Sequence, residues 1–148
     1  MSIRAVSSRA ILRRAMSRTN VEIVRQFTEA WERRDTDVMV ELVDPNVEQY
    51  GTVGGLEEGR ILRGITEIAR DYERVEEMWD EHRVEIERLI DAGDQVVVFQ
   101  REYQRGRSSG VELVIDAAVI FALRDGRIIR LRGYMDRAAA LEAAGVSE

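Results

Sequence analysis

The sequence has no cysteine and no lysine, and it has one histidine and one proline in 148 residues. The absence of cysteine excludes disulfides, thiolate nucleophiles and cysteine-bound metals, and the absence of lysine excludes Schiff-base chemistry. One histidine, His82, cannot build a histidine-rich metal site within one chain. Catalysis would therefore fall to Asp, Glu, Tyr, Arg or hydroxyl groups, and we expect neither a metal nor a cofactor.

Long apolar runs are also missing, since none approaches the roughly 20 residues that a membrane span requires. All 22 basic residues are arginine, and five of them lie in residues 1–19, which contain no acid. The remainder has 17 arginines against 28 acids, a net charge of −11. An acidic body argues against nucleic acid as a partner, because phosphate binding depends on basic side chains. We expect a cytoplasmic protein that binds neither nucleic acid nor membrane.

The length predicts one domain, over residues 20–148, preceded by a basic tail over residues 1–19. The tail has the Arg, Ser and Ala composition of a transit peptide. A disordered or loosely helical tail is the simpler interpretation.

Helical patterns come first in the chain. Asn20 and Thr36 are candidate N-caps for a helix from Val21 and for a second, short helix. A short strand over 47–50 and a loop with four glycines (51–60) follow. Residues 64–80 give the clearest helix, because their apolar side chains recur at spacings of three and four.

Strand patterns fill the second half, over 82–90, 95–105, 111–124 and 127–135. Strand 111–124 is apolar on nearly both faces, although a meander strand with one wet face should alternate. The predicted helices can cover one face only, so we expect the other face to pack on a second copy of the chain. The fold class is α+β, with a curved mixed or antiparallel sheet wrapped around the N-terminal helices.

Three segments carry a family resemblance: VRQFTEAWERRD (24–35), Asp44–Val47, and LRDGRIIRLRGYMDRAAALEAAG (123–145). With the element order, they resemble the SnoaL-like branch of the nuclear-transport-factor-2-like superfamily. The resemblance implies a cone-shaped domain with an internal pocket, and a homodimer formed through the sheet. It covers roughly residues 20–145. The superfamily includes isomerases, cyclases, hydrolases and non-catalytic binders, so the fold alone does not give the function.

Strand alternation in this fold predicts an apolar, aromatic pocket. The predicted pocket residues are Phe27, Trp31, Tyr50, Tyr72, Val75, Trp79, Phe99, Ile115, Val119, Leu131 and Met135. The expected ligand is a small apolar molecule, cyclic or polyketide-like.

The sharpest catalytic hypothesis pairs Glu48 with Arg101 inside this pocket. An arginine would keep a buried carboxylate ionised, so Glu48 could remove an acidic C–H proton. Arg101 or the hydroxyl of Tyr50 or Tyr103 would then stabilise the enolate. A structural ion pair without turnover is an equally good interpretation.

The resemblance also bears on single positions. Limonene epoxide hydrolases use an arginine between two aspartates. By the resemblance the arginine matches Arg101, and the two aspartates match Tyr103 and Gly133, so both acids are missing. The helix-1 tyrosine of ketosteroid isomerases falls on Phe27. Asp136 is the nearest match to the acid of SnoaL-type cyclases, but it is also well placed as a helix N-cap, which we favour. His82, beside Asp80 and Glu81, is expected to be solvated.

Two functions follow. The first is binding of the apolar molecule with cofactor-free isomerase, cyclase, hydratase or hydrolase chemistry. The alternative is a non-catalytic ligand-binding or dimeric interaction domain of the same fold. The missing acids at Tyr103 and Gly133 favour the alternative.

Overall fold

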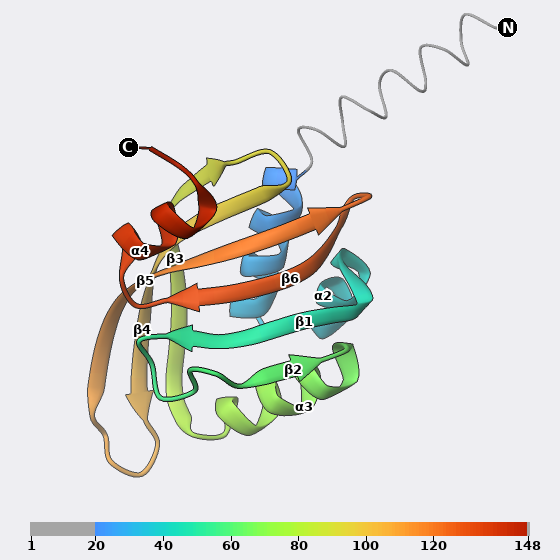
Figure 1. Cartoon of the computed structure of the whole chain (residues 1–148). Helices are drawn as coiled ribbons and strands as arrows, with labels where there is room; N and C mark the ends of the chain where they lie inside the picture. The colour runs from blue at the N-terminus through green and yellow to red at the C-terminus, as the bar shows by residue number, and fades with distance from the viewer. Residues whose placement is uncertain (1–19, 148) are drawn as a thin grey trace, which may run out of the picture.

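The structure is a computed structural model that describes residues 20–147. Within that part of the chain, six strands form one mixed sheet in the order β2-β1-β6-β5-β4-β3 (Figure 1). The strands are β1 (Val43–Val53), β2 (Ile61–Arg63), β3 (Trp79–Asp91), β4 (Gln95–Gly106), β5 (Glu112–Arg124) and β6 (Arg127–Tyr134). β1 pairs with β6 in parallel, and the other neighbours pair antiparallel. The predicted α+β fold with a curved mixed sheet is confirmed.

Three helical segments lie against one face of the sheet, which we call the inner face (Figure 1). They are the helix of residues 20–32, α2 (Thr36–Leu42) and α3 (Ile65–Glu76). The main core forms between them and the sheet, where Val24, Phe27 and Met39 meet Val96, Val98 and Phe121. The space that this packing leaves between helices and sheet becomes the candidate site.

The last helix, α4 (Arg137–Ala144), lies on the opposite, outer face. Ala140 of α4 packs with Ala118, Ile120 and Val97 in a second apolar cluster. The expectation that helices cover only one face of β5 was therefore wrong. Its two apolar faces follow from helices on both sides of the sheet, so they do not by themselves require a second copy.

Several element boundaries differ from the sequence-based ones. α3 ends at Glu76, and Trp79 starts β3 opposite Gly106 rather than extending the helix stripe. Pairing with β4 thus replaces the last turn of the predicted helix. The short strand β2 was not predicted, since three residues carry no periodicity.

The caps differ as well. Asp35, not Thr36, caps α2, because its side chain accepts a hydrogen bond from the Val38 amide. Asn20 is itself helical, and its side-chain amide donates to the Gly93 carbonyl at 3.1 Å. Asp125 and Gly126 form the β5–β6 turn with φ values of 53° and 76°, as a type I′ hairpin requires.

The predicted basic tail of residues 1–19 lies outside the described residues. Among the helices that are described, none is long and apolar enough to cross a membrane.

Candidate functional site

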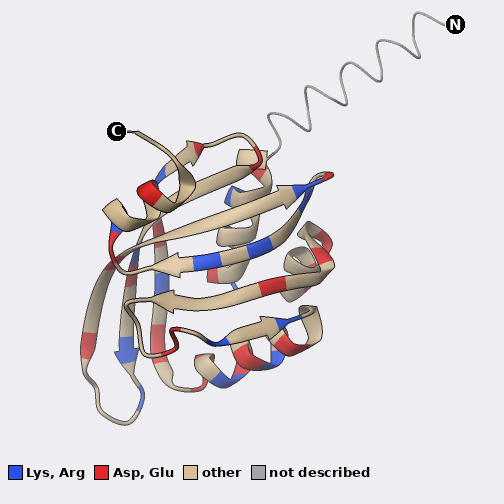
Figure 2. Cartoon of the chain, viewed as in Figure 1, with Lys and Arg blue, Asp and Glu red and all other residues tan. Residues whose placement is uncertain are grey.

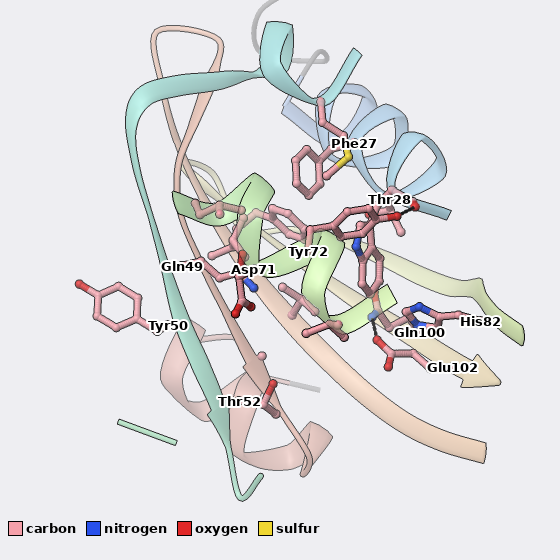
Figure 3. A pocket seen from close by; sticks show the side chains of 18 of the residues that line it. Phe27, Thr28, Gln49, Tyr50, Thr52, Asp71, Tyr72, His82, Gln100 and Glu102 are labelled. Carbon is pink, nitrogen blue, oxygen red and sulfur yellow. Dashed lines mark hydrogen bonds between the residues drawn. The ribbon is translucent and has the colours of Figure 1, made fainter. Parts of the chain in front are cut away.

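A cavity of about 260 Å³ lies between the inner face of the sheet and the helices. Its lining comes from the helix of 20–32, α2, α3 and five strands (Figure 3). The lining residues are Phe27, Thr28, Trp31, Met39, Gln49, Tyr50, Thr52, Ile68, Asp71, Tyr72, Val75, His82, Gln100, Glu102, Gln104, Val119, Phe121, Leu131 and Gly133. Seven of the predicted pocket residues are among them: Phe27, Trp31, Tyr50, Tyr72, Val75, Val119 and Leu131.

Aromatic side chains form much of the apolar wall. Phe27 meets Phe121 edge to face at 5.6 Å between ring centroids, and Trp31 lies 6.1 Å from Tyr72. The Tyr72 hydroxyl donates to the Trp31 carbonyl, and burial is the main cause that raises the pKa of Tyr72 to about 12. Tyr72 therefore remains protonated and joins α3 to the first helix.

Polar side chains occupy three alternate positions of β4 on this inner face. Gln100 Nε2 donates to Glu102 Oε1 at 2.7 Å, and Gln104 Nε2 donates to Glu102 Oε2 at 3.2 Å. Burial raises the pKa of the Glu102 carboxyl, an effect that His82 and the bond from Gln100 partly offset. We call Gln100, Glu102 and Gln104 the polar row. It places a carboxyl group and two amides against an otherwise largely apolar cavity.

His82 lines the same cavity beside Glu102 (Figure 3). Its side chain is only 6% exposed, so the expectation of a solvated histidine was wrong. Nδ1 lies 2.8 Å from Glu76 Oε1, and the ring meets Trp31 edge to face at 5.1 Å. Nε2 is buried without a hydrogen-bond partner. The alternation His82, Val84, Ile86 carried a signal for this inward orientation, because the intervening residues are charged.

Arg101 and Tyr103 lie on the outer face, contrary to the prediction. Arg101 Nε binds Asp116 Oδ1 at 2.7 Å and lies 3.4 Å from Glu87. The ion pair with Arg101 lowers the pKa of Asp116. Tyr103 stacks under Arg83, with 4.5 Å from the guanidinium carbon to the ring centroid. The predicted cluster of Glu48, Arg101 and Tyr103 is thus not formed.

Glu48 also points away from the cavity. Glu48 Oε2 binds Arg63 Nε at 3.3 Å, across the β1–β2 pair, and its other oxygen accepts from the Tyr50 hydroxyl. The Tyr50 ring lies on the far side of β1 from Gln49 (Figure 3), where Arg132 stacks over it at 4.3 Å. Tyr50 therefore reaches the cavity lining without presenting its hydroxyl there.

The error in β4 has a simple physical cause. Val96, Val97 and Val98 are all fully buried, since helices pack on both faces of the sheet. Apolar alternation therefore cannot tell which face is the inner one. The pairing decides it: Val98 lies opposite Val119, which faces the cavity, so Gln100 and Glu102 face it too.

Gly133 lines the cavity, and Thr52 fills the space beside it. A Cβ on Gly133 would lie 2.6 Å from Thr52 Oγ1. The resemblance assigns a catalytic acid to position 133. In this protein the Thr52 side chain of the neighbouring strand fills the space that such a side chain would need.

The remaining predicted residues lie elsewhere. The Asp136 side chain accepts from the Ala138 amide at 3.0 Å as the N-cap of α4. Phe99 lies on the outer face under Arg137, and Met135 is 43% exposed. Trp79 and Ile115 are partly buried outside the cavity lining.

Known proteins share features of this sequence and fold. The family model of the SnoaL-like domain matches residues 24–131. The chain belongs to the SnoaL-like domain family. No curated protein sequence matches it.

Solved structures share the fold of this SnoaL-like chain. A nuclear-transport-factor-2-like protein from Burkholderia thailandensis is 26% identical, with a TM-score of 0.71, over 83% of this chain and 95% of that chain. A protein described as a SnoaL-like polyketide cyclase, from Jannaschia sp. CCS1, is 24% identical (TM-score 0.71; 90% and 96% covered). TerC, co-crystallised with polyporic acid, is 24% identical (TM-score 0.70; 86% and 98% covered). The last two likenesses show the fold alone.

Proposed function

We propose that the cavity binds a small, mostly apolar molecule of one or two rings that carries a hydroxyl or carbonyl oxygen. The observation that carries this proposal is the polar row, which faces an otherwise largely apolar, aromatic cavity. A few polar groups in an apolar cavity are typical of small-molecule sites, where they orient the ligand.

The volume narrows the class of ligand. An apolar cavity of about 150 Å³ holds one benzene ring, and sites for drug-sized ligands begin at about 300 Å³. A cavity of about 260 Å³ fits one or two rings better than a multi-ring polyketide. TerC, which shares the fold, was co-crystallised with polyporic acid, and this supports a small organic molecule as the class of ligand.

The polar row suits a ligand oxygen either as a hydrogen-bond acceptor or as a hydroxyl donor. Each glutamine amide uses one N–H on Glu102, which leaves the second N–H of the same group for a carbonyl oxygen. The Glu102 carboxylate can accept from a ligand hydroxyl. Net negative charge on the ligand would be unfavourable beside Glu102, so we expect a neutral molecule.

Calorimetric titration with 2-naphthol tests the proposal. Wild-type protein and the outer-face variant Arg101→Gln should bind it equally. Val119→Phe, which fills the cavity from β5, should abolish binding while the protein still unfolds cooperatively. Equal binding by Val119→Phe, or no binding by the wild type, would contradict the proposal.

We also propose a homodimer. Exposed apolar side chains gather where β5 begins, at Val111, Leu113 and Val114, which are 54%, 44% and 62% exposed. A second copy of the chain would cover them in the manner that the family resemblance implies. A cytoplasmic location stays a prediction.

A further inference from the structure

Three polar side chains, each within ion-pair or hydrogen-bond distance of the next, connect the surface to the cavity. Arg34 Nη2 lies 2.7 Å from Glu76 Oε2, and Glu76 Oε1 lies 2.8 Å from His82 Nδ1. Arg34 is half exposed, whereas the Glu76 and His82 side chains are 12% and 6% exposed. The connection therefore ends at the His82 imidazole ring, which lines the cavity.

The contacts of the ring determine its tautomer. A carboxylate accepts hydrogen bonds, so we infer that the nitrogen that faces Glu76, Nδ1, carries the proton. The lone pair of the neutral ring is then on Nε2, which is buried and has no partner within the described residues. A purely structural buried histidine would be expected to use both nitrogens. An unused acceptor beside a ligand cavity points to a role in chemistry.

The surroundings of the ring are acidic and aromatic. The groups that face it or its partner are Glu76 and Tyr72 from α3, Glu102 from β4, Trp31 from the first helix, and Arg34 through Glu76. Two carboxyl groups near the ring would stabilise an imidazolium ion formed during a reaction. The hydroxyl of Tyr72 donates to the Trp31 carbonyl and therefore does not compete for the ring.

We propose that His82 is the general base of a cofactor-free proton transfer on a carbonyl compound bound in the cavity, with Glu76 as its positioning residue. This inference rests on the proposed function, because it needs a ligand in the cavity. No other histidine exists in the chain to take this role.

The step balances without an oxidant or a cofactor. His82 Nε2 takes a proton from the carbon next to the carbonyl group, and the C–H bond breaks. Its electron pair forms a C=C bond, and the carbonyl oxygen becomes an enolate oxygen. The second N–H of Gln100 or Gln104 can donate to that oxygen. When the proton on Nε2 is replaced by a solvent deuteron before the enolate is reprotonated at the same carbon, the ligand gains deuterium, and reprotonation at a conjugated carbon gives an isomer.

Deuterium exchange of 2-tetralone in heavy water, followed by proton NMR, tests the step. This two-ring ketone has acidic C–H groups beside its carbonyl. We expect wild-type protein to accelerate exchange above the buffer rate, and His82→Gln to lose about 100-fold or more, the usual contribution of a general base. Glu76→Gln should also lose exchange, whereas the exposed neighbour variant Glu77→Gln should retain it.

Nitrogen chemical shifts of the single imidazole supply a second readout that does not depend on turnover. In the pH range where its ring is neutral, the wild type should show a protonated Nδ1 and an unprotonated Nε2, and Glu76→Leu, which removes the acceptor, should lose this preference. A merely structural Glu76 would change stability and leave the tautomer unaltered. The opposite tautomer in the wild type would overturn the proposal.

Binding of 2-tetralone, measured by calorimetry on the same samples, separates the two proposals. Binding without accelerated exchange, or with exchange equal in His82→Gln, overturns the role of His82 and leaves the binding function intact. Absence of binding by the wild type overturns the proposed function and this inference with it.

Discussion

At the scale of single residues, the fold changes the ionisation of Glu102. Burial raises its pKa above the ordinary value of 4.5, although it accepts hydrogen bonds from two amides. The folded state therefore binds the proton more tightly than the unfolded chain. The stability from this group is complete below the ordinary carboxyl pKa and falls as the pH rises through the raised pKa.

Replacement of Glu102 by Gln should remove this pH dependence, since the amide does not titrate. We expect Glu102→Gln to gain stability relative to the wild type as the pH rises from 4 towards 8. Urea unfolding of both proteins across that range measures the difference. Parallel stability curves would show that Glu102 ionises equally in the folded and unfolded chain.

Gly133 and Thr52 form a matched pair of small residues beside the cavity. A methyl group on Gly133 would lie 2.6 Å from Thr52 Oγ1, so Gly133→Ala should destabilise the protein by about 1–3 kcal/mol. The double variant Gly133→Ala/Thr52→Ala should regain most of that loss, because the clashing atom is gone. Additive losses in thermal unfolding would refute this packing account.

His82 shows why single site residues were hard to predict. Its neighbours Asp80 and Glu81 suggested solvent, but Glu81 is adjacent to it in β3 and so points to the opposite face. A register irregularity between Trp79 and Glu81 lets Asp80 pair with Arg105 beside Glu81. Its decisive partners, Glu76 and Trp31, lie on two other elements, and no local pattern announces such contacts. The aromatic residues of the helices were easier to predict as cavity residues, because helical spacing alone places Phe27 and Tyr72 towards the sheet.

At the scale of elements, β4 carries the largest error and its explanation. Its residues Val96 to Val98 are buried on both faces, so the sequence does not reveal which alternate set faces the cavity. The prediction chose the wrong alternate set by one residue, so it placed Arg101 and Tyr103 in the cavity in place of Gln100 and Glu102. Only the pairing with β5 resolves this, and it involves residues about 20 positions apart.

α4 shows a cap that was predicted correctly from local chemistry, since Asp136 accepts from the Ala138 amide. Asp136→Ala should cost about 1 kcal/mol of stability, and Asp136→Asn should cost much less. Neither change should weaken binding of 2-naphthol, because Asp136 is not part of the cavity lining. Loss of binding in a folded Asp136→Asn would instead assign this acid to the site.

At the scale of the whole molecule, the fold was predictable because turns, stripes and the C-terminal segment agreed on one architecture. What the sequence could not show is that α4 covers the outer face of the sheet, which contributes to the apolar character of both faces of β5. Figure 2 shows basic and acidic residues spread over both helices and strands. Most of these arginines take part in ion pairs, for example Arg101 with Asp116.

The exposed start of β5 gives a prediction about assembly. We expect the wild type to have the mass of a dimer in light scattering at micromolar concentration. Val114→Glu, which places a charge among Val111 and Leu113, should shift it to a monomer without loss of the fold. A monomeric wild type would refute the proposed dimer.

The central claim is that the polar row, and not the predicted pair of Glu48 and Arg101, contacts the ligand. Nitrogen-resolved NMR of the side chains during titration with 2-naphthol tests it most directly. The side-chain amide signals of Gln100 and Gln104 should shift to saturation, while the Arg101 Nε signal should stay in place. A shift at Arg101 without a shift at either glutamine would contradict the account.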